Sequence, residues 1–308
     1  ADEAADSAAA HAQLMEFVNA RLAVTREARR RCLLVRAPPL LPVSPHARLV
    51  QSEESAVSLL DVCHAAAGAE AALDTFAARM AERRDASGQV TESQAVEVFR
   101  ELCDLVPNTT LLRRMHRSLA DINGFVRWRK VFSQQLGIHA LLTHAFGMAP
   151  PAPADLEFCL ATGLVSIVVA PNPVLPPGPC ASMRLTRSLQ ATVGPFGVDG
   201  PVLAAANAAA EALADDESPL VDWLAVLERA QVVGWERRAE TGLGDPMATD
   251  HPASARLAAV SPPILPETLT GAQSGMVSNL NQRLGDLINV ATADGLLASM
   301  PGGWQAWI

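Results

Sequence analysis

The sequence predicts an α+β fold that is predominantly helical, and three observations support this prediction. Most of the chain repeats apolar residues at three- and four-residue steps, which is the period of an amphipathic helix. Strand character is confined to short stretches within 32–50 and 156–170, so the sheet is expected to be small. Hydrophobic residues make up 49% of the 308 residues, which is enough for a substantial core.

The first 50 residues predict a long helix followed by a fragment of sheet. Residues 6–31 place apolar side chains at helical spacing, namely Leu14, Phe17, Val18 and Leu22. Two short extended pieces follow, "CLLVRAPPLLPV" (32–43) and "ARLV" (47–50). Because prolines confine such strands to sheet edges, we expect the end of a small sheet whose other strands lie outside this chain.

Helix start signals organise the next hundred residues. Ser52, followed by two glutamates, predicts a helix in "AVSLLDVCHAAA" (56–67), because acids favour the positive end of the helix dipole. A polar, mobile stretch is expected around 82–90, and Thr91 with Gln94 forms a capping-box pattern that begins another helix. A short helix (109–120) then precedes a long one (122–147). The long helix is apolar around most of its girth, which is typical of a central, buried helix.

The second half begins with a proline-rich loop and a hairpin. "LEFCL" and "LVSIVVA" flank the turn Ala161-Thr162-Gly163, which predicts two antiparallel strands within 156–170. Helices of small residues are expected at about 201–214 and 219–238, followed by a flexible loop over 241–275. A last helix begins near Met276 and precedes the ending "WQAWI".

Charge and composition exclude several kinds of chemistry. The net charge of −9 argues against a nucleic-acid-binding surface, and the arginines within 26–31 and 113–117 fit solvated helix faces. The sequence has no tyrosine, and Lys130 is its single lysine. Lys130 lies in a helical stretch with no glycine-rich loop near it, which indicates a surface position rather than a phosphate-binding one.

The cysteines and histidines also fit structural roles. The cysteines show no C-x-x-C spacing, so buried thiols are expected at Cys32, Cys63, Cys103, Cys159 and Cys180. His139 and His144 lie on the long helix without a third ligand at a recognisable spacing, so we expect core or boundary residues rather than a metal site.

The sequence shows no membrane or targeting segment: no apolar run is long enough to cross a bilayer, and no signal-peptide pattern opens the chain. The first residue is Ala rather than Met, so the chain could be a piece of a longer protein.

Several motifs in order resemble the phosphatidylinositol-3-kinase-related kinase family. Active members carry G-D-R-H-x-x-N, a hairpin with a T/S-G turn, D-F-G, an extended loop and P-F-R-L-T. Here Gly147 begins the loop, Thr162-Gly163 takes the turn, and Arg184-Leu185-Thr186 matches the last motif. The ending "WQAWI" resembles the C-terminal FATC segment of the family. The stretches 39–62 and 127–148 are similar to a pseudokinase branch made of large scaffold subunits of histone acetyltransferase complexes.

The resemblance implies a kinase-like fold with an incomplete N-lobe, a helical C-lobe and a C-terminal FATC helix. Residues 1–50 would be the remainder of the N-lobe, and 51–240 the C-lobe with the hairpin 156–170. The flexible loop 241–275 would then lead to an FATC-like segment, 276–308. Trp304 and Trp307 are candidates for anchoring this segment to the kinase-like core, or are ordinary core aromatics.

Phosphoryl transfer needs a base, cations around the phosphate and oxygen ligands for magnesium. The resemblance places Pro150 at the catalytic aspartate, Pro151 at its arginine neighbour, Ala152 at the histidine and Asp155 at the metal-binding asparagine. Val169, Ala170 and Pro171 stand at D-F-G. Asp155 alone could ligate a cation, and a lone carboxylate cannot organise magnesium and ATP.

We therefore predict no catalytic, cofactor-binding or metal residues and no cofactor. The sequence Gly-Leu-Gly-Asp that ends at Asp245 resembles the front of the catalytic motif. No Arg, His or Asn follows it at the required step and no hairpin comes after it, so loop composition explains it.

The resemblance implies a catalytically inactive region of a large nuclear scaffold in a SAGA-like histone acetyltransferase coactivator complex. Its partners would be protein subunits of that complex and transcription activators, with no direct nucleic acid and no membrane. The enzymatic alternative is a divergent PI3K-related kinase or a nucleotide-binding domain. A third interpretation is a helical adaptor with coincidental kinase-like spacing, which predicts that no hairpin lies beside the long helix.

Overall fold

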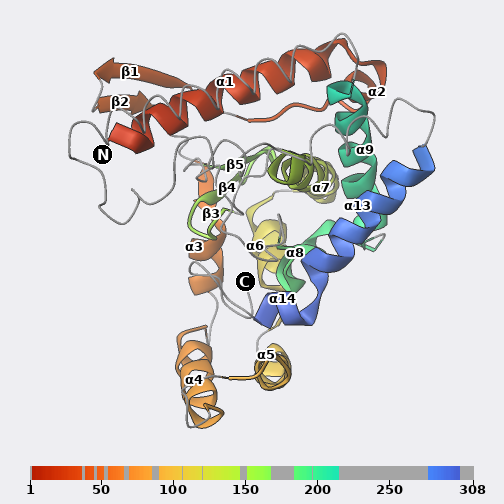
Figure 1. Cartoon of the computed structure of the whole chain (residues 1–308). Coiled ribbons are helices and arrows are strands. Elements are labelled where there is room, and N and C mark those ends of the chain that lie inside the picture. The colour runs from red at the N-terminus through yellow and green to blue at the C-terminus, as the bar shows by residue number, and fades with distance from the viewer. Residues whose placement is uncertain are drawn as a thin grey trace, which may run out of the picture.

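A long central helix organises the computed structural model (Figure 1). The structure describes residues 2–36, 39–44, 47–51, 55–65, 69–84, 90–105, 107–119, 121–145, 151–167, 184–195, 197–214 and 277–298. The central helix is α7 (Ile122–Ala145), seen end-on in Figure 1, and the other elements surround it. Most described elements are helices and the sheets are small, which confirms the predicted α+β class.

The burial of α7 follows from its sequence. Trp128, Phe132 and Leu136 are at most 3% exposed, and so are the aliphatic residues of its second half. Apolar side chains therefore face neighbours on most sides, as expected for a helix that is apolar around its girth. The predicted range was 122–147, and the described helix ends at Ala145.

The N-terminal segment covers one side of this centre. Helix α1 (Asp2–Val24) lies across the top of Figure 1 and is followed by the short α2 (Arg26–Arg30). Leu14, Val18 and Leu22 are buried in one apolar cluster with the second half of α7 and helix α9 (Pro201–Leu213). The predicted helical face is therefore confirmed.

Beside α1 lies a two-stranded ribbon. Strands β1 (Leu40–Ser44) and β2 (Ala47–Val50) pair antiparallel, with Leu41 opposite Leu49. No third strand joins them among the described residues, which agrees with the expected edge character of this proline-containing piece.

One predicted helix starts later than expected. Residues 56–58 form strand β3 (Ala56–Ser58), and helix α3 (Leu59–His64) begins only at Leu59. The N-cap is Ser58, whose hydroxyl accepts the N–H of Asp61 at 3.0 Å and donates to its carboxylate at 2.7 Å. The prediction from Ser52 was wrong because Ser58 offers the same capping chemistry while residues 56–58 pair with a distant strand. Residues 52–54 lie outside the described ranges.

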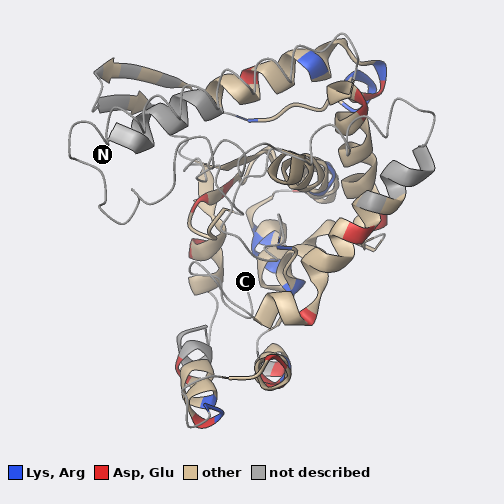
Figure 2. Cartoon of the chain, in the orientation of Figure 1, with Lys and Arg blue, Asp and Glu red and all other residues tan. Residues whose placement is uncertain are grey.

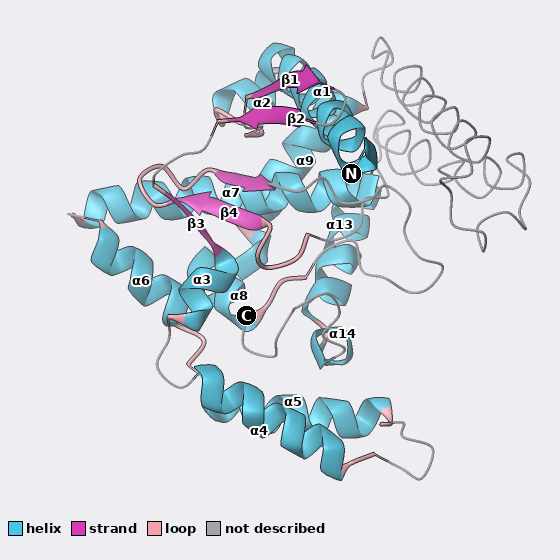
Figure 3. Ribbon diagram, turned by 90° about the vertical axis from the view of Figure 1, so that its left-hand side faces the viewer, coloured by secondary structure: helices cyan, strands magenta, loops and turns pink. Residues whose placement is uncertain are grey.

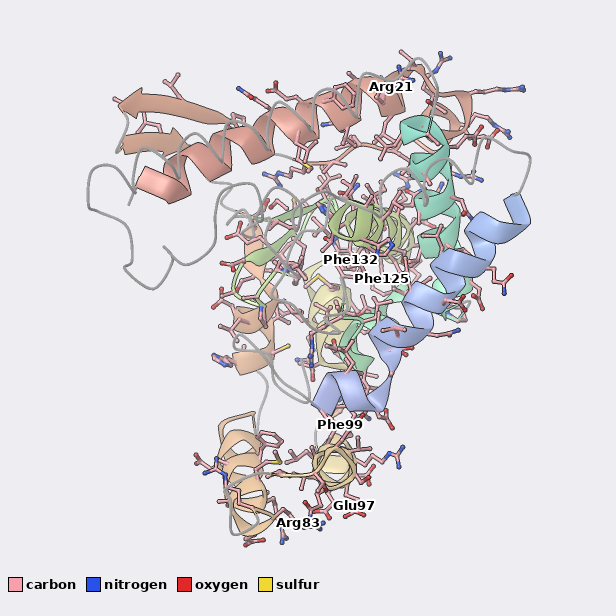
Figure 4. The ribbon with its side chains drawn as sticks, in the orientation of Figure 1. Arg21, Arg83, Glu97, Phe99, Phe125 and Phe132 are labelled. Atoms are coloured by element: carbon pink, nitrogen blue, oxygen red, sulfur yellow. The ribbon has the colours of Figure 1, made fainter. Side chains whose placement is uncertain are left out.

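A helical hairpin projects at the bottom of Figure 1. Helix α4 (Ala69–Glu82) packs against α5 (Glu92–Leu105), and Arg83 lies 2.6 Å from Glu97 across the pair (Figure 4). Thr91 and Gln94 form the predicted capping box: the Gln94 N–H donates to the Thr91 hydroxyl at 3.4 Å, and the Gln94 side chain accepts the Thr91 N–H at 3.1 Å. Phe99 and Leu102 turn toward the core.

The remaining elements close the molecule around α7. They are α6 (Thr110–Ser118), β4 (Leu156–Cys159), β5 (Val165–Ile167), α8 (Arg187–Val193), the 3₁₀ turn η1 (Gly197–Asp199), α9, α13 (Val277–Thr292) and α14 (Asp294–Ala298). Strands β3, β4 and β5 form an antiparallel sheet in that order (Figure 3). Several expectations fall outside the described ranges: the helix 219–238, the loop 241–275, residues 168–170 and the ending 299–308.

A close helix crossing joins α7 to α9. Gly137 has no side chain, and a Cβ built there would lie 2.1 Å from the carbonyl oxygen of Val202. The facing side of α9 is rich in alanine, with Ala205 and Ala209 fully buried. Small residues on both helices allow their backbones to approach closely, so α7 packs tightly against α9 at this crossing.

Candidate functional site

The candidate site is a platform made by the β4–β5 hairpin on the side of α7. The indole N–H of Trp128 donates to the carbonyl of Cys159 at 3.0 Å, and Nε2 of His139 lies 3.2 Å from the carbonyl oxygen of Val165. The Phe158 ring packs edge-on against both Trp128 and Phe132, which stack on each other with centroids 4.8 Å apart. Two polar contacts and an aromatic cluster thus hold the hairpin on the long helix.

The turn of the hairpin requires glycine. Gly163 has φ of +80°, and a Cβ there would lie 2.6 Å from the carbonyl oxygen of Trp128. Its N–H donates to the Cys159 carbonyl at 2.9 Å. The predicted Thr162-Gly163 turn is confirmed, and only a residue without a side chain fits so close to α7.

The loop that precedes β4 is also fixed by backbone contacts. The N–H groups of Asp155 and Leu156 donate to the carbonyl of Ala152, and the carbonyl of Pro153 accepts the N–H of Leu60 in α3. Pro151, Ala152 and Asp155, three of the positions matched to the catalytic loop, therefore lie in an ordered turn at the end of the sheet. Pro150, Val169, Ala170 and Pro171 lie outside the described residues.

Asp155 is the carboxylate at these described positions. Burial raises the pKa of Asp155, and a hydrogen bond from the backbone of Ala152 acts in the opposite direction. Among the described residues, no group of three His, Cys, Asp or Glu side chains is arranged to hold a metal ion. The arrangement therefore offers one half-buried acid without the further ligands that a magnesium–nucleotide complex needs.

A second acid on the hairpin was missed by the sequence analysis. Glu157 lies on β4 opposite Ser58 of β3, and burial raises its pKa, while Arg36 lowers it and Asp61 raises it further. The alternation of β4 could have indicated it, since Phe158 faces α7 and its neighbour must face the other side. No motif linked Arg36, Asp61 and Glu157, which are far apart in the sequence.

The predicted Arg184-Leu185-Thr186 segment contacts the C-terminal helices. The two terminal nitrogens of the Arg184 guanidinium donate to the carbonyls of Leu296 at 2.9 Å and Leu297 at 2.7 Å. The N–H of Leu185 donates to the carbonyl of Ala291 at 3.0 Å. Arg184 is 5% exposed, and burial lowers its pKa to about 10. The segment matched to the P-F-R-L-T motif thus holds α14 in place.

A surface ion pair adds a second link to α14. Arg100 of α5 lies 2.7 Å from the carboxylate of Asp294, and both side chains are substantially exposed. Arg187, next to the matched segment, donates to the carbonyl of Cys103 at the end of α5 at 2.6 Å. Helix α5, the Arg184 segment and the C-terminal helices are therefore joined to one another.

The other singled-out residues lie away from the platform or in structural roles. Lys130 is exposed on α7, and His144 is half-buried with its pKa lowered by burial. Cys63, Cys103 and Cys159 are buried as predicted, and no disulfide joins the four described cysteines. The prediction of a buried thiol was wrong for Cys32, which is exposed in the turn that ends α2. Burial raises the pKa of Cys63 to about 12, so it is an unreactive thiol. Cys180, Asp245, Trp304 and Trp307 lie outside the described residues.

The arginines within 26–31 and 113–117 are for the most part exposed on helix faces, as expected. Within the described part of the chain, no helix is both long enough and apolar enough to cross a membrane.

Comparison with known proteins identifies relatives across nearly the whole chain. The sequence is 21% identical to the SAGA complex/NuA4 acetyltransferase complex subunit Tra1 of Schizosaccharomyces pombe over 96% of this chain and 9% of that protein. It is 22% identical to the transcription-associated protein 1 of Drosophila melanogaster over 96% of this chain and 8% of that protein. The human transformation/transcription domain-associated protein (TRRAP) is 21% identical over 77% of this chain and 6% of its own length. No model of a known protein family matches the sequence.

Solved structures identify the fold. The FAT and kinase domain of CtTel1 superposes with a TM-score of 0.68 at 17% identity, over 98% of this chain and 21% of that one. The open conformation of CtTel1 gives the same score over 11% of its chain. The chain spans about a tenth or less of the curated relatives it matches. Tra1 and TRRAP are homologues of this chain, and its fold is that of the FAT and kinase domains of PI3K-related kinases.

Proposed function

We propose that this chain is the catalytically inactive, kinase-like region of a large nuclear scaffold subunit of a histone acetyltransferase coactivator complex. The homology supports this proposal: Tra1 is a subunit of the SAGA and NuA4 complexes, and the other relatives are named for transcription. The chain matches only a small part of each relative. The scaffold role is proposed for this region because it is homologous to part of those relatives, whose names refer to the whole proteins.

One observation carries the proposed lack of catalysis. The hairpin is held on α7 and the preceding loop on α3, and the resemblance matches this loop and hairpin to the phosphotransfer site of active members. In that loop Pro151 and Ala152 occupy positions where the resemblance expects an arginine and a histidine. Neither side chain can bind a phosphate, accept a proton or ligate a metal. Loss of such groups lowers the rate of phosphoryl transfer by orders of magnitude. A chain that retains the fold around the site but lacks these groups is therefore better suited to a structural role.

In that role the region contributes surfaces rather than chemistry. Its partners would be protein subunits of the acetyltransferase complex and transcription activators, and it would need no cofactor. The chain would not acetylate a substrate itself. Hydrogen bonds and an ion pair join α5, the Arg184 segment and α14. These contacts would hold in place the surface that neighbouring subunits bind.

Nucleotide binding separates this proposal from the enzymatic alternative. A ligand that binds only the folded state stabilises it, by about 2.7 kcal/mol at a hundred times its Kd. We expect no change in the melting temperature of the chain with Mg·ATP or Mn·ATP at millimolar concentration, measured beside the kinase domain of Tel1 as a positive control. A saturable rise in the melting temperature would contradict the proposal.

The alternative has one specific observation in its favour. Asp155 is a half-buried carboxyl with a raised pKa, and perturbed acids cluster at functional sites. If Asp155 holds a cation with a nucleotide, any thermal shift caused by Mg·ATP must disappear in Asp155→Ala, because alanine offers no oxygen ligand, whereas asparagine is the residue that binds the metal in active members of the family. A shift that survives this substitution would place the nucleotide elsewhere on the chain, and the interpretation of Asp155 as a cation ligand would then fail.

A further inference from the structure

The first two turns of α7 present a side that no described element covers. Ile122 and Val126 are 61% and 57% exposed, although both are large aliphatic residues. Asn123, Arg127 and Lys130 are exposed on the same side. These five residues are called the α7 face below.

Helical geometry joins these residues into one surface. Ile122, Val126 and Lys130 follow one another at four-residue steps, so the two aliphatic side chains and the aliphatic stem of the lysine form a continuous stripe. Asn123 and Arg127 form the adjacent stripe. The opposite side of α7 carries Phe125 and Trp128, which are buried, so the α7 face points away from the core. In Figure 3, α6 and the start of α7 lie on the opposite side of the molecule from α13 and α14.

The α7 face is unusual in its apolar content. Single exposed aliphatic residues are normal on protein surfaces, but neighbouring ones on a helix form a patch. Ile and Val are also weaker helix formers than Ala, Leu or the long charged residues, so an exposed helix surface gains nothing local from them. A docked partner would give both side chains a favourable environment.

The charge around the face is strongly one-sided. Between residues 105 and 154 the sequence contains one acid, Asp121, against Arg113, Arg114, Arg117, Arg127, Arg129 and Lys130. Asp121 accepts the N–H of Gly124 at the beginning of α7, so its charge is used at the helix N-terminus. Helix α6, which packs beside α7, is blue without red in Figure 2.

The cations of this region have few internal partners. Arg129 is held in place, since its Nε donates to the carbonyl of Thr192 at 2.9 Å and its guanidinium lies over the Phe125 ring. The other five are exposed, and the ion pairs found within the described part of the chain include none of them. In a chain with a net charge of −9, this local excess of positive charge selects for an acidic partner.

We propose that the α7 face docks an acidic amphipathic segment of a protein partner. Aliphatic side chains of that segment would pack on Ile122 and Val126, while its carboxylates would pair with Arg127 and Lys130. Arg113, Arg114 and Arg117 on the neighbouring helix would steer its approach. The inference rests on the proposed scaffold function and names one of its docking surfaces.

A pair of designed helical peptides tests the proposal. One carries Leu along one side and Glu elsewhere, and the other has Lys in place of every Glu. We expect the chain to bind the fluorescently labelled Glu peptide, and not the Lys peptide, in anisotropy titrations at about 0.15 M salt. The double variant Ile122→Ser/Val126→Ser should weaken this binding about tenfold or more, because the aliphatic contacts are lost.

Charge reversal gives the sharpest arm. Arg127→Glu/Lys130→Glu should lose the Glu peptide and gain the Lys peptide, which also shows that the variant surface is intact. As matched controls, Val24→Ser/Val290→Ser removes equally exposed aliphatic residues elsewhere, and Arg113→Glu/Arg114→Glu makes the same charge change on α6. The first control should bind like the unchanged chain, and the second should change binding less than the reversal on α7.

Two results would overturn the proposal. One is equal binding of the Glu peptide to the chain and to Ile122→Ser/Val126→Ser. The other is binding of a DNA duplex or of phosphatidylserine vesicles that depends on Arg127 and Lys130 but not on Ile122 and Val126, since that surface would recognise phosphate. Neither result bears on nucleotide binding by the platform, so the two proposals fail separately.

Discussion

Arg184 shows how one residue connects distant parts of the chain. Its guanidinium reaches two carbonyls at the end of α14, where a helix has no internal partners for its last C=O groups and favours a cation. It is buried, so both hydrogen bonds are shielded from water. The sequence analysis singled out Arg184 through its motif, but its partners follow only from the folded chain.

Replacing Arg184 should therefore be costly. We expect Arg184→Ala to lower the free energy of unfolding by about 2–4 kcal/mol, because two charge-assisted hydrogen bonds are lost from a buried site. Arg184→Lys should recover part of this loss, since an ammonium cannot span both carbonyls in the same way. Urea denaturation followed by circular dichroism measures both.

Arg100 provides the matched control. It also ties α14 to the body of the molecule, through Asp294, but its side chain is 68% exposed. Exposed ion pairs contribute about 0–1 kcal/mol, so Arg100→Ala should have a small effect. Equal losses for Arg100→Ala and Arg184→Ala would show that burial of Arg184 is not what matters.

His144 predicts a pH dependence of stability. Burial lowers its pKa below the ordinary value of 6.5, so the unfolded chain takes up a proton at a higher pH than the folded chain. Stability is then lost as the pH falls through 6.5 toward the folded-state pKa. We expect His144→Gln to lose less stability than the unchanged chain between about pH 7 and about pH 5.5.

Comparing the two proteins isolates this contribution. Asp155 and Glu157 have raised pKa values, so their protonation favours the folded state at lower pH and opposes the effect of His144. Both acids are present in both proteins, and their contribution cancels in the difference. Identical pH profiles in thermal denaturation would contradict a role for His144.

At the scale of elements, the crossing of α7 and α9 depends on a missing side chain. A Cβ on Gly137 would lie 2.1 Å from a backbone oxygen of α9, so Gly137→Ala must push the two helices apart. We expect a loss of about 3 kcal/mol or more in the free energy of unfolding, at the upper end of the cost of overpacking.

Gly285 of α13 is the control for the same substitution. A Cβ there would meet no atom within 4 Å, so Gly285→Ala should be neutral or stabilise the chain by up to about 1 kcal/mol, since alanine favours a helix. Chemical denaturation of the two variants side by side tests the crossing. A neutral Gly137→Ala would mean that the helices are not as close as the structure has them.

The elements also show where sequence reasoning succeeds. The long helix, the Thr91–Gln94 cap and the hairpin within 156–170 were predicted from local signals, and the described residues contain all three, the hairpin as far as Ile167. The start of α3 was misplaced because pairing of Ala56–Ser58 with β4, about a hundred residues away, overrides the local helix signal. The position of Gly137 at a helix crossing could not be predicted, because the backbone that it must approach, at Val202, belongs to another helix.

At the scale of the whole molecule, the fold was predicted from the order and spacing of several motifs, none of which is decisive by itself. The kinase-like fold and the Tra1/TRRAP homologues confirm that part of the prediction. The hairpin beside α7 contradicts the helical-adaptor interpretation, which required its absence. The domain boundaries at 50, 240 and 275 and the lack of catalytic residues remain predictions.

The sequence predicted which residues occupy the candidate site, but not which residues from other parts of the chain lie beside them. Pro151, Ala152 and Asp155 were identified by matching the motif, whereas Glu157, Asp61 and Arg36 come together only through the three-stranded sheet. Long-range pairing brings such groups together, and no local pattern in one sequence encodes it.

The central claim is that this region acts through its fold and not through phosphotransfer chemistry. The most direct measurement is the acetyltransferase activity that co-precipitates with the full-length protein carrying either Asp155→Ala or Gly137→Ala in this region. We predict unchanged activity for Asp155→Ala, which removes the remaining carboxylate at the matched positions, and a clear loss for Gly137→Ala, which disturbs the fold. Loss of activity with Asp155→Ala while Gly137→Ala retains it would contradict the account.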